Sequence, residues 1–424
     1  MLKNFKYFLT LNKTILCMKL FFSLSGILFL WIPCCEVNAQ YTIPPGLTNL
    51  TDTRGNIHWG PLKIHPLFTL SEAFDDNIFD TPTKEESDFI TIYSPGLNLF
   101  LPIKGLKSEL NMSYLANFLE YRENPEQDHI DQYIEGSFKT IFPLGLSITL
   151  NNRFEDTELP PTFDYILGEL IQRTKRKSNY FTTTIALPDY FANFDPELYY
   201  SNSDNQYEEF KDSSYNEQKI GARLTYKLFT KLSTLAEFNI GKTTYDTGVL
   251  SDSIFYESLV GIQFKGTAKT TGTFKVGYRI RDYEDKEVDQ FSGVILSLEA
   301  ETRLNALTSI SILLRRSQEE VLFTQHGNFY ELNSIYLTFR RKLTKKLEGS
   351  ISNYYQVLDF PAFDSEPSTE FFTWGLNTSL SYMIQKWLFT ELSYWYEDRD
   401  SSSDNSEELG RKKNVITFTI GATF

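Results

Sequence analysis

Cysteine is scarce in this sequence, and what there is lies near the start. The chain of 424 residues has only three cysteines, Cys17, Cys34 and Cys35. They fall in a segment with basic residues, an apolar core and a small-residue site ending at Ala39, which predicts a secretory signal peptide over residues 1–39. The mature chain would then have no thiol, which excludes disulfides, cysteine catalysis and thiolate metal sites. A lipid anchor on one of the paired cysteines is the alternative, although the residues before them do not form a typical lipobox.

Long apolar runs are also missing. After Gln40 no run approaches the roughly 20 residues that a membrane-spanning helix requires. Nevertheless the chain has 25 tyrosines, 35 phenylalanines and 41% hydrophobic residues, while its mean hydropathy is −0.31. Alternating strands explain both facts, because they place apolar side chains on one face and polar side chains on the other.

Motifs for catalysis or for cofactors are absent. The four histidines, His58, His65, His129 and His326, lie in separate segments, and no serine, histidine and carboxylate occur at a recognisable spacing. There is no Gly-rich phosphate motif and no set of metal ligands. The sequence therefore predicts a protein that is not an enzyme, with no cofactor, catalytic site or metal site. A formal net charge of −14 makes the chain a poor partner for nucleic acid.

Runs of about ten residues with period two recur along the chain. In each run one face is apolar and the other carries Ser, Thr, Gly, Asn, Lys, Arg or Glu. The clearest runs cover residues 219–228, 232–241, 273–281, 306–314, 334–340, 374–383 and 414–424. Their connections alternate between short turns, such as 142–145 and 385–386, and long polar loops, such as 203–217 and 397–410.

Short turns on one side and long loops on the other are typical of bacterial outer-membrane barrels. We therefore predict an all-β fold, a closed antiparallel transmembrane β-barrel over residues 61–424. Counting runs from Lys63 to Phe424 gives eighteen strands with both ends in the periplasm, and sixteen strands is the alternative. Residues 40–60 show no periodicity and are expected to form a periplasmic lead-in to the barrel.

Closure of the sheet follows from the membrane environment. An unpaired backbone group in hydrocarbon is costly, so the strand ending at Phe424 is expected to pair with the first strand. A terminal aromatic on an alternating strand resembles the signal that the barrel-assembly machinery recognises, so this machinery is an expected partner. A soluble β-sandwich or propeller is the rival fold. Aromatic residues at strand ends, such as Phe372, Trp374 and Tyr382, favour the membrane barrel because they resemble an interfacial girdle.

Two segments, "FTLSEAFDDNIFDT" (68–81) and "SDFITIYSPGLNLFLP" (87–102), carry a resemblance to a known family. They resemble the start of the outer-membrane β-barrel porin family associated with exopolysaccharide biosynthesis and export operons. The matching residues are Ser71, Glu72, Phe74, Asp76, Asn77, Ser94, Pro95 and Gly96. The resemblance implies an outer-membrane barrel linked to polysaccharide secretion, and it carries over no functional residue.

Positions that alternate with the lipid-facing ones are expected to line the lumen. The candidate pore-lining residues are the cations Arg223, Arg279, Arg281, Arg315 and Arg340 and the anions Glu237, Glu257 and Glu299. Rings of Arg or Lys favour anions in a channel. The expected anion-contacting patch consists of Arg279, Arg281, Arg315 and Arg340, which lie on strands of one half of the barrel. The structural alternative is that Arg and Glu simply pair across neighbouring strands.

The longest predicted loop covers residues 155–179. A helix-compatible segment in it ends in a basic run, Arg173, Lys175, Arg176 and Lys177. Such a loop folds inward as a constriction, or it forms an exposed flap whose basic run touches acidic lipopolysaccharide; both interpretations stay open.

These observations predict a monomeric outer-membrane channel for export of an extracellular polysaccharide. Its expected partners are outer-membrane lipid and lipopolysaccharide, the polysaccharide substrate and periplasmic export components. The first rival is a general diffusion porin for small solutes. The second is a non-transporting structural, adhesion or scaffold barrel.

Overall fold

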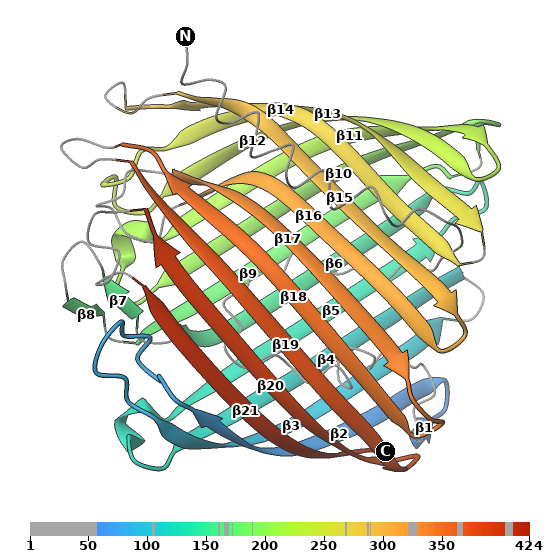
Figure 1. Ribbon diagram of the computed structural model, residues 1–424. Helices are drawn as coiled ribbons and strands as arrows, with labels where there is room; N and C mark the ends of the chain where they lie inside the picture. Colours follow the sequence, from blue (N-terminus) through green and yellow to red (C-terminus); the bar gives the residue numbers. More distant parts are fainter. Residues whose placement is uncertain are drawn as a thin grey trace.

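The computed structural model describes residues 57–103, 107–159, 162–164, 169–171, 173–188, 190–267, 269–285, 288, 290–320, 329–362, 368–402 and 410–424. The predicted signal peptide and nearly all of the predicted lead-in lie outside these residues. Long strands make up most of the described chain and wrap into a closed wall (Figure 1). No described helix is long and apolar enough to cross a membrane.

The strands that build the wall are long. They contain 13 to 17 residues each, more than the roughly 9–11 that cross the hydrocarbon of a bilayer, so their ends extend beyond it. The strands are β1 Ile57–Trp59, β2 Leu62–Asp75, β3 Asp88–Ile103, β4 Lys107–Tyr121, β5 His129–Ile141, β6 Ser147–Leu159, β7 Thr162–Asp164, β8 Glu169–Ile171, β9 Thr174–Ala186, β10 Phe194–Tyr207, β11 Tyr215–Phe229, β12 Leu232–Tyr245, β13 Ser253–Thr267, β14 Thr270–Tyr283, β15 Phe291–Asn305, β16 Thr308–Glu320, β17 Phe329–Lys342, β18 Leu347–Phe360, β19 Thr369–Gln385, β20 Leu388–Ser401 and β21 Arg411–Thr423. Two single-turn 3-10 helices, η2 Pro125–Gln127 and η3 Lys211–Ser213, lie in the connections.

Each strand of the wall pairs antiparallel with its neighbours in the chain. The short strands β7 and β8 form a separate hairpin, so β6 pairs directly with β9, and the three-residue β1 pairs with the start of β2. The last strand, β21, pairs with β2 and closes the sheet. Strands β2–β6 and β9–β21 thus form a closed antiparallel barrel, which confirms the predicted fold and its eighteen strands.

The seam between β2 and β21 is hydrogen-bonded along its length. Its register runs from Leu67 opposite Thr423 to Asp75 opposite Val415. Beyond this ladder, the Phe424 N–H donates to the Pro66 carbonyl at 3.0 Å. The closed sheet therefore leaves no strand edge at the junction, as the hydrocarbon requires.

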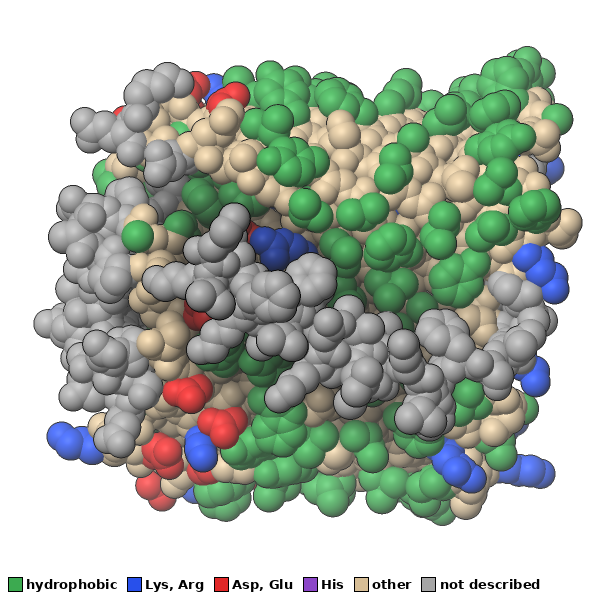
Figure 2. Space-filling view, turned by 45° about the horizontal axis from the view of Figure 1, so that its top comes forward, with side chains coloured by type: hydrophobic (Ala, Val, Ile, Leu, Met, Phe, Trp, Pro, Cys, Tyr) green, Lys and Arg blue, Asp and Glu red, His purple; other side chains and the backbone are tan. Residues whose placement is uncertain are grey.

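Large apolar side chains cover the outside of the wall. They occupy alternate positions, and on the seam alone Phe68, Leu70, Ile416, Phe418 and Ile420 are 42–48% exposed. Figure 2 shows hydrophobic side chains spread over the outer surface, with Lys and Arg side chains along its right-hand rim. In water such a surface would be strongly unfavourable, so the outer face is a lipid-facing belt.

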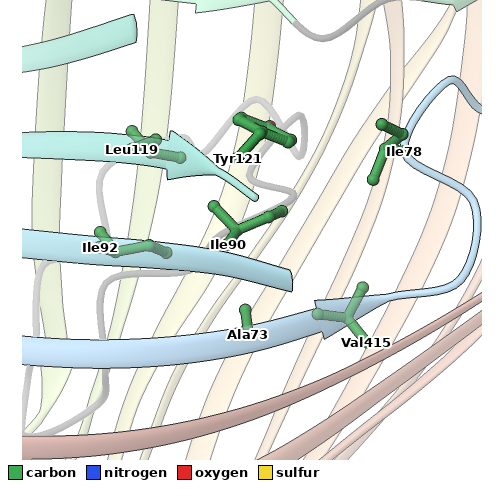
Figure 3. Close-up of a cluster of buried hydrophobic side chains, with 7 residues drawn as sticks. All are labelled: Ala73, Ile78, Ile90, Ile92, Leu119, Tyr121 and Val415. Carbon is green, nitrogen blue, oxygen red and sulfur yellow. The ribbon is translucent and has the colours of Figure 1, made fainter. Parts of the chain in front are cut away.

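The loop between β2 and β3 folds against the inner side of the wall. Its Ile78 is 3% exposed and packs with buried residues of β2, β3, β4 and β21. Figure 3 shows this cluster, which consists of Ala73, Ile78, Ile90, Ile92, Leu119, Tyr121 and Val415. The presence of apolar side chains at these inward-facing positions is thus explained, because the loop between β2 and β3 covers them.

Ion pairs fasten the same loop to the seam. Asp80 forms a salt bridge with Arg411 and another, at 3.2 Å, with Lys413. Lys413 also lies 2.9 Å from Asp75, and its side chain is fully buried. Asp80 has φ of 55°, a left-handed conformation that aspartate tolerates better than most residues. Burial by itself would raise the pKa of Asp80, but the charges of Arg411 and Lys413 outweigh it and hold the pKa below the usual 3.8.

The substitution Asp80→Asn should destabilise the barrel at neutral pH. It leaves two buried cations with fewer carboxylate partners, a loss of about 3–5 kcal/mol when one partner of a buried pair is removed. Because the folded-state pKa of Asp80 is depressed, its stabilisation is present above the unfolded-state pKa and is lost as the pH falls below 3.8. Urea midpoints of detergent-folded protein at pH 7 and at about pH 3 should show a gap between variant and wild type that narrows at the lower pH.

The exposed Glu85 of the same loop supplies the control. The variant Glu85→Gln removes an equal charge and should match wild type at both pH values. An equal urea midpoint for Asp80→Asn and wild type at pH 7 would show that the ion pairs do not stabilise the loop.

Candidate functional site

Charged side chains on β10–β14 occupy the inner face of the wall and are paired with one another. Glu197, Arg223 and Glu237 are direct cross-strand partners on β10, β11 and β12. The Arg223 guanidinium lies 2.9 Å from Glu197 and 2.8 Å from Glu237. Lys275 of β14 lies 3.1 Å from the same Glu237 oxygen. Two cations and two carboxylates thus neutralise each other along this row.

A second group of paired charges lies on neighbouring inward positions. Arg279 of β14 forms a salt bridge with its cross-strand partner Glu257 of β13. Arg281 lies 3.4 Å from Glu217 of β11, and its side chain is 2% exposed. Both guanidinium groups lie 4.9 Å from the ring centroid of Phe255, close enough for a cation–π contact. The contacts therefore hold these arginines against the wall.

The other predicted pore-lining residues are dispersed on further strands. Arg315 of β16 pairs with Glu319 four residues along the same strand, and Arg340 of β17 lies 3.6 Å from Glu348 of β18. The arginines expected to form one anion-contacting patch thus each have a carboxylate partner of their own. Glu299 of β15 lies on the same inner face and has no Lys or Arg nitrogen within 4.0 Å among the described residues.

The basic run of the predicted constriction loop is not all in a loop. Lys175, Arg176 and Lys177 belong to β9, where they pair in register with residues 156–158 of β6. The irregular connection, residues 160–173, is therefore shorter than the predicted 155–179, and residues 160, 161, 165–168 and 172 lie outside the described part of the chain. Arg176 faces inward and lies 3.1 Å from Glu155, whereas Lys175 and Lys177 are exposed at outward-facing positions.

Arg173, which directly precedes β9, joins a cluster that the sequence did not reveal. Its guanidinium contacts the His129 ring at 3.3 Å and donates to the Tyr121 hydroxyl at 3.0 Å. Asp131 lies 3.9 Å from the same histidine ring. These residues come from β4, β5 and the connection before β9, so only the register of the folded sheet brings them together.

A neutral polar wall on β16–β21 is the other feature that the sequence analysis missed. Inward positions there carry many hydroxyl and amide side chains besides charged ones such as Arg315, Glu391 and Arg411. Several of the neutral side chains are hydrogen-bonded in pairs, such as Thr338 with Ser352 at 2.9 Å and Ser350 with Ser379 at 2.8 Å. The wall includes Ser309, Ser311, Ser334, Thr338, Ser350, Ser352, Gln356, Asn377, Ser379, Ser393 and Thr417. Long runs of Ser, Thr and Asn at alternate positions were the available signal.

Aromatic rings interrupt this neutral wall. Tyr336 and Tyr354 stack with ring centroids 5.4 Å apart and planes at 24°, and Trp395 Nε1 lies 3.3 Å from the Tyr354 hydroxyl. The Tyr354 ring lies flat against Gly375 of the next strand, where any Cβ would overlap it. Glycine thus supplies the space in which the ring lies against the backbone.

No group of three or more His, Asp or Glu side chains in the described part of the chain is placed to hold a metal ion. The arrangement that the residues do make is a wall of paired charges facing a wall of hydroxyl groups and aromatic rings. Such a surface can form many weak hydrogen bonds and ring contacts with a polar molecule that moves along it.

Comparison with known proteins identifies the family. The family model described as "Putative beta-barrel porin 2" matches residues 53–420. The chain belongs to this family. No curated protein matches. The porin is accordingly a bacterial outer-membrane protein, and its predicted outer-membrane location and non-enzymatic character are confirmed.

Solved outer-membrane structures are similar in outline. OccAB3 of Acinetobacter baumannii is 8% identical with a TM-score of 0.48, covering 86% of this chain and 99% of that one. OpdK of Pseudomonas aeruginosa is 8% identical with a TM-score of 0.46, covering 85% and 99%. The FrpB iron transporter of Neisseria meningitidis is 10% identical with a TM-score of 0.45, covering 81% of this chain, which spans only 63% of FrpB.

Neutralising Glu237 should make the porin pass anions more easily. The variant Glu237→Gln leaves Arg223 and Lys275 with one fewer carboxylate, and a unit charge at about 4 Å in water is worth about 1 kcal/mol. We therefore expect the chloride-to-potassium permeability ratio, measured from reversal potentials in a planar bilayer, to rise by about fivefold.

The matched control is Glu331→Gln, which removes the same charge from the outward face, where Glu331 pairs with Arg316. It should leave the permeability ratio unchanged. An unchanged ratio in both variants would show that the charged row on β10–β14 does not border the ion path.

Proposed function

We propose that this porin is a channel for the export of an extracellular polysaccharide across the outer membrane. The neutral wall of β16–β21 is the observation that supports the proposal most. Sugars present hydroxyl groups that donate and accept hydrogen bonds, and the Ser, Thr, Asn and Gln side chains of this wall offer complementary partners. Weak neutral contacts of this kind suit a long chain that must keep moving.

The aromatic pair in the wall supports the same substrate class. Tyr336 is half-buried and stacks on the buried Tyr354, so the Tyr336 ring offers an apolar face beside hydroxyl groups, and the amide of Gln356 donates to the Tyr336 hydroxyl at 2.6 Å. A pyranose ring has both a hydroxyl rim and a C–H face, so it matches a surface with a polar rim around an aromatic face. We propose that Tyr336 contacts the polysaccharide during its passage.

The predicted pore-lining residues of β11–β14 enter this proposal as the opposite wall, whereas Arg315 and Arg340 lie on β16 and β17 within the neutral wall. We propose that Arg223, Arg279 and Arg281 with Glu237 and Glu257, and further along Arg315, Arg340 and Glu299, line the path. Because most of these charges are paired, they would repel neither sign strongly. The same balance suits a general diffusion porin for small polar solutes, which is the second candidate function.

Contact with lipopolysaccharide is a further proposed role for the outer face of β9. Lys175 and Lys177 point outward near the extracellular end of the barrel, and Lys175 lies 3.9 Å from Glu158. Lipopolysaccharide carries phosphates at this level of the membrane, and lysine ammonium groups pair with phosphates.

Deletion of the gene, followed by complementation, tests the export function. The deletion strain should lose extracellular polysaccharide, measured as sugar content of the washed-off polymer, and the wild-type gene should restore it. Complementation with Tyr336→Ala should restore less than wild type, because the aromatic contact is missing.

The control variant is Tyr355→Ala, which removes the same ring from the lipid-facing side of the adjacent strand, where it is 42% exposed. Both variants should reach the outer membrane as folded, heat-modifiable barrels. Unchanged polymer in the deletion strain would leave the general diffusion porin as the better function, and absence of any bilayer conductance would instead favour a scaffold barrel.

A further inference from the structure

Basic side chains collect at the end of the barrel where the short turns lie. On several strands a cation occupies one of the last two inward-facing positions. These residues are Lys63 on β2, Lys107 on β4, Lys139 on β5, Lys227 on β11, Lys265 on β13, Arg303 on β15, and Arg340 and Lys342 on β17. We call this set the periplasmic ring, since short turns of outer-membrane barrels face the periplasm.

The turns beside the ring add charge of the same sign. Lys231, Lys269, Lys345, Lys346 and Lys386 are exposed in them, and the described turn residues include no Asp or Glu. The right-hand rim in Figure 2 shows the result as a row of Lys and Arg side chains. The positive field at this end is therefore not confined to one strand.

Acidic residues at the level of the ring only partly neutralise it. They are Glu109, Asp195, Glu301, Glu348 and Glu391, of which Asp195 lies 2.8 Å from Lys227, Glu301 4.0 Å from Arg303 and Glu348 3.6 Å from Arg340. Lys107, Lys139 and Lys342 are exposed and have no described carboxylate oxygen within 4.0 Å, although Glu109 is the cross-strand neighbour of Lys139 and Glu348 that of Lys342. These three lysines keep a positive charge available at the mouth.

The charge of the periplasmic end differs from that of the rest of the barrel. On β10–β14 the inward arginines Arg223, Arg279 and Arg281 each contact a carboxylate. At the opposite end the described loops are acidic, with Glu123 before η2, Glu126 within it, and Glu208 and Glu209 before η3. The charge thus changes along the barrel axis, from cationic at the periplasmic mouth through paired charges to acidic at the extracellular loops.

We propose that the periplasmic ring is a binding site for a polyanionic chain, and that the exported polysaccharide carries carboxylate or phosphate groups. A cation-lined mouth with low-dielectric walls concentrates anions at its entrance, and a ring of Lys and Arg favours anions over cations. A polymer with regularly spaced charges engages several lysines at once, which raises its effective concentration at the mouth. The identity of the chain as the exported polymer rests on the proposed function, whereas the binding of polyanions does not.

Binding to purified protein in detergent tests the site directly. Fluorescently labelled oligogalacturonate, a polycarboxylate, should bind at low ionic strength and weaken as salt rises, because screening shortens the range of the field to about 10 Å at 0.1 M. Neutral dextran of similar length should not compete with it. The triple variant Lys107→Gln, Lys139→Gln, Lys342→Gln should bind at least about tenfold more weakly, since three unpaired charges are lost.

The matched control removes three cations from the other end of the barrel. Lys211→Gln, Lys242→Gln, Lys412→Gln alters exposed lysines on or beside the acidic loops and should bind oligogalacturonate as tightly as wild type. Both triple variants are compared as folded, heat-modifiable barrels. In a planar bilayer, oligogalacturonate should block the wild-type current from one side only, and the ring variant should lose this one-sided block.

Equal binding by wild type and the ring variant, equal loss in the control variant, or competition by neutral dextran would each overturn the proposal. These results are separate from the export test. Polyanion binding in a protein whose deletion leaves extracellular polymer unchanged would disprove export while supporting an anion site at the mouth. Loss of polymer on deletion without polyanion binding would support export of a neutral polysaccharide.

Discussion

Hydrogen bonding across the seam between β2 and β21 is the constraint on which the rest of this structure depends. A sheet in hydrocarbon cannot leave a strand edge unpaired, so the last strand must return to the first. Closure forces an even number of antiparallel strands when both ends lie on the same side, and it separates every strand into a lipid face and an inner face. Phe418 and Ile420 therefore point to lipid, while their neighbours Thr417 and Thr419 point inward. The loop that carries Asp80 anchors this same junction from inside, through Arg411 and Lys413 of β21.

Once the sheet is closed, the polar side chains of the inner face need hydrogen-bond or ion-pair partners on that same face. The barrel does so in two different ways on its two sides. On β10–β14 charges of opposite sign alternate between neighbouring strands, as Glu197, Arg223 and Glu237 do. On β16–β21 hydroxyl groups pair with one another, and Tyr354 fills the space left by Gly375. One side of the interior is therefore lined by paired charges and the other mainly by hydroxyl groups and aromatic rings.

The sequence was sufficient to predict the strands, their number and the lipid-facing positions, because these depend on a period of two within about ten residues. It was insufficient for the contacts of the inner side chains, because these depend on register between strands. Arg281 meets Glu217 across two intervening strands, and Asp80 meets Arg411 across most of the chain. The predicted loop 155–179 was too long for a related reason. Lys175 and Lys177 lie on outward positions above the apolar belt, so the alternation that marks β9 is lost there.

The arrangement of charge along the axis has a physical logic for a channel that moves a charged polymer. Binding must be favourable enough to draw the chain in and weak enough to release it. Unpaired cations deep in the lumen would hold a polyanion, whereas unpaired cations at the mouth only gather it. Arg223 and Arg279 are neutralised by Glu237 and Glu257, so a chain that has passed the periplasmic ring meets balanced charges and hydroxyl groups. The acidic loops beyond, with Glu208 and Glu209, do not retain a polyanion. The same sequence of surfaces would be unsuited to a cationic solute, which the periplasmic mouth repels.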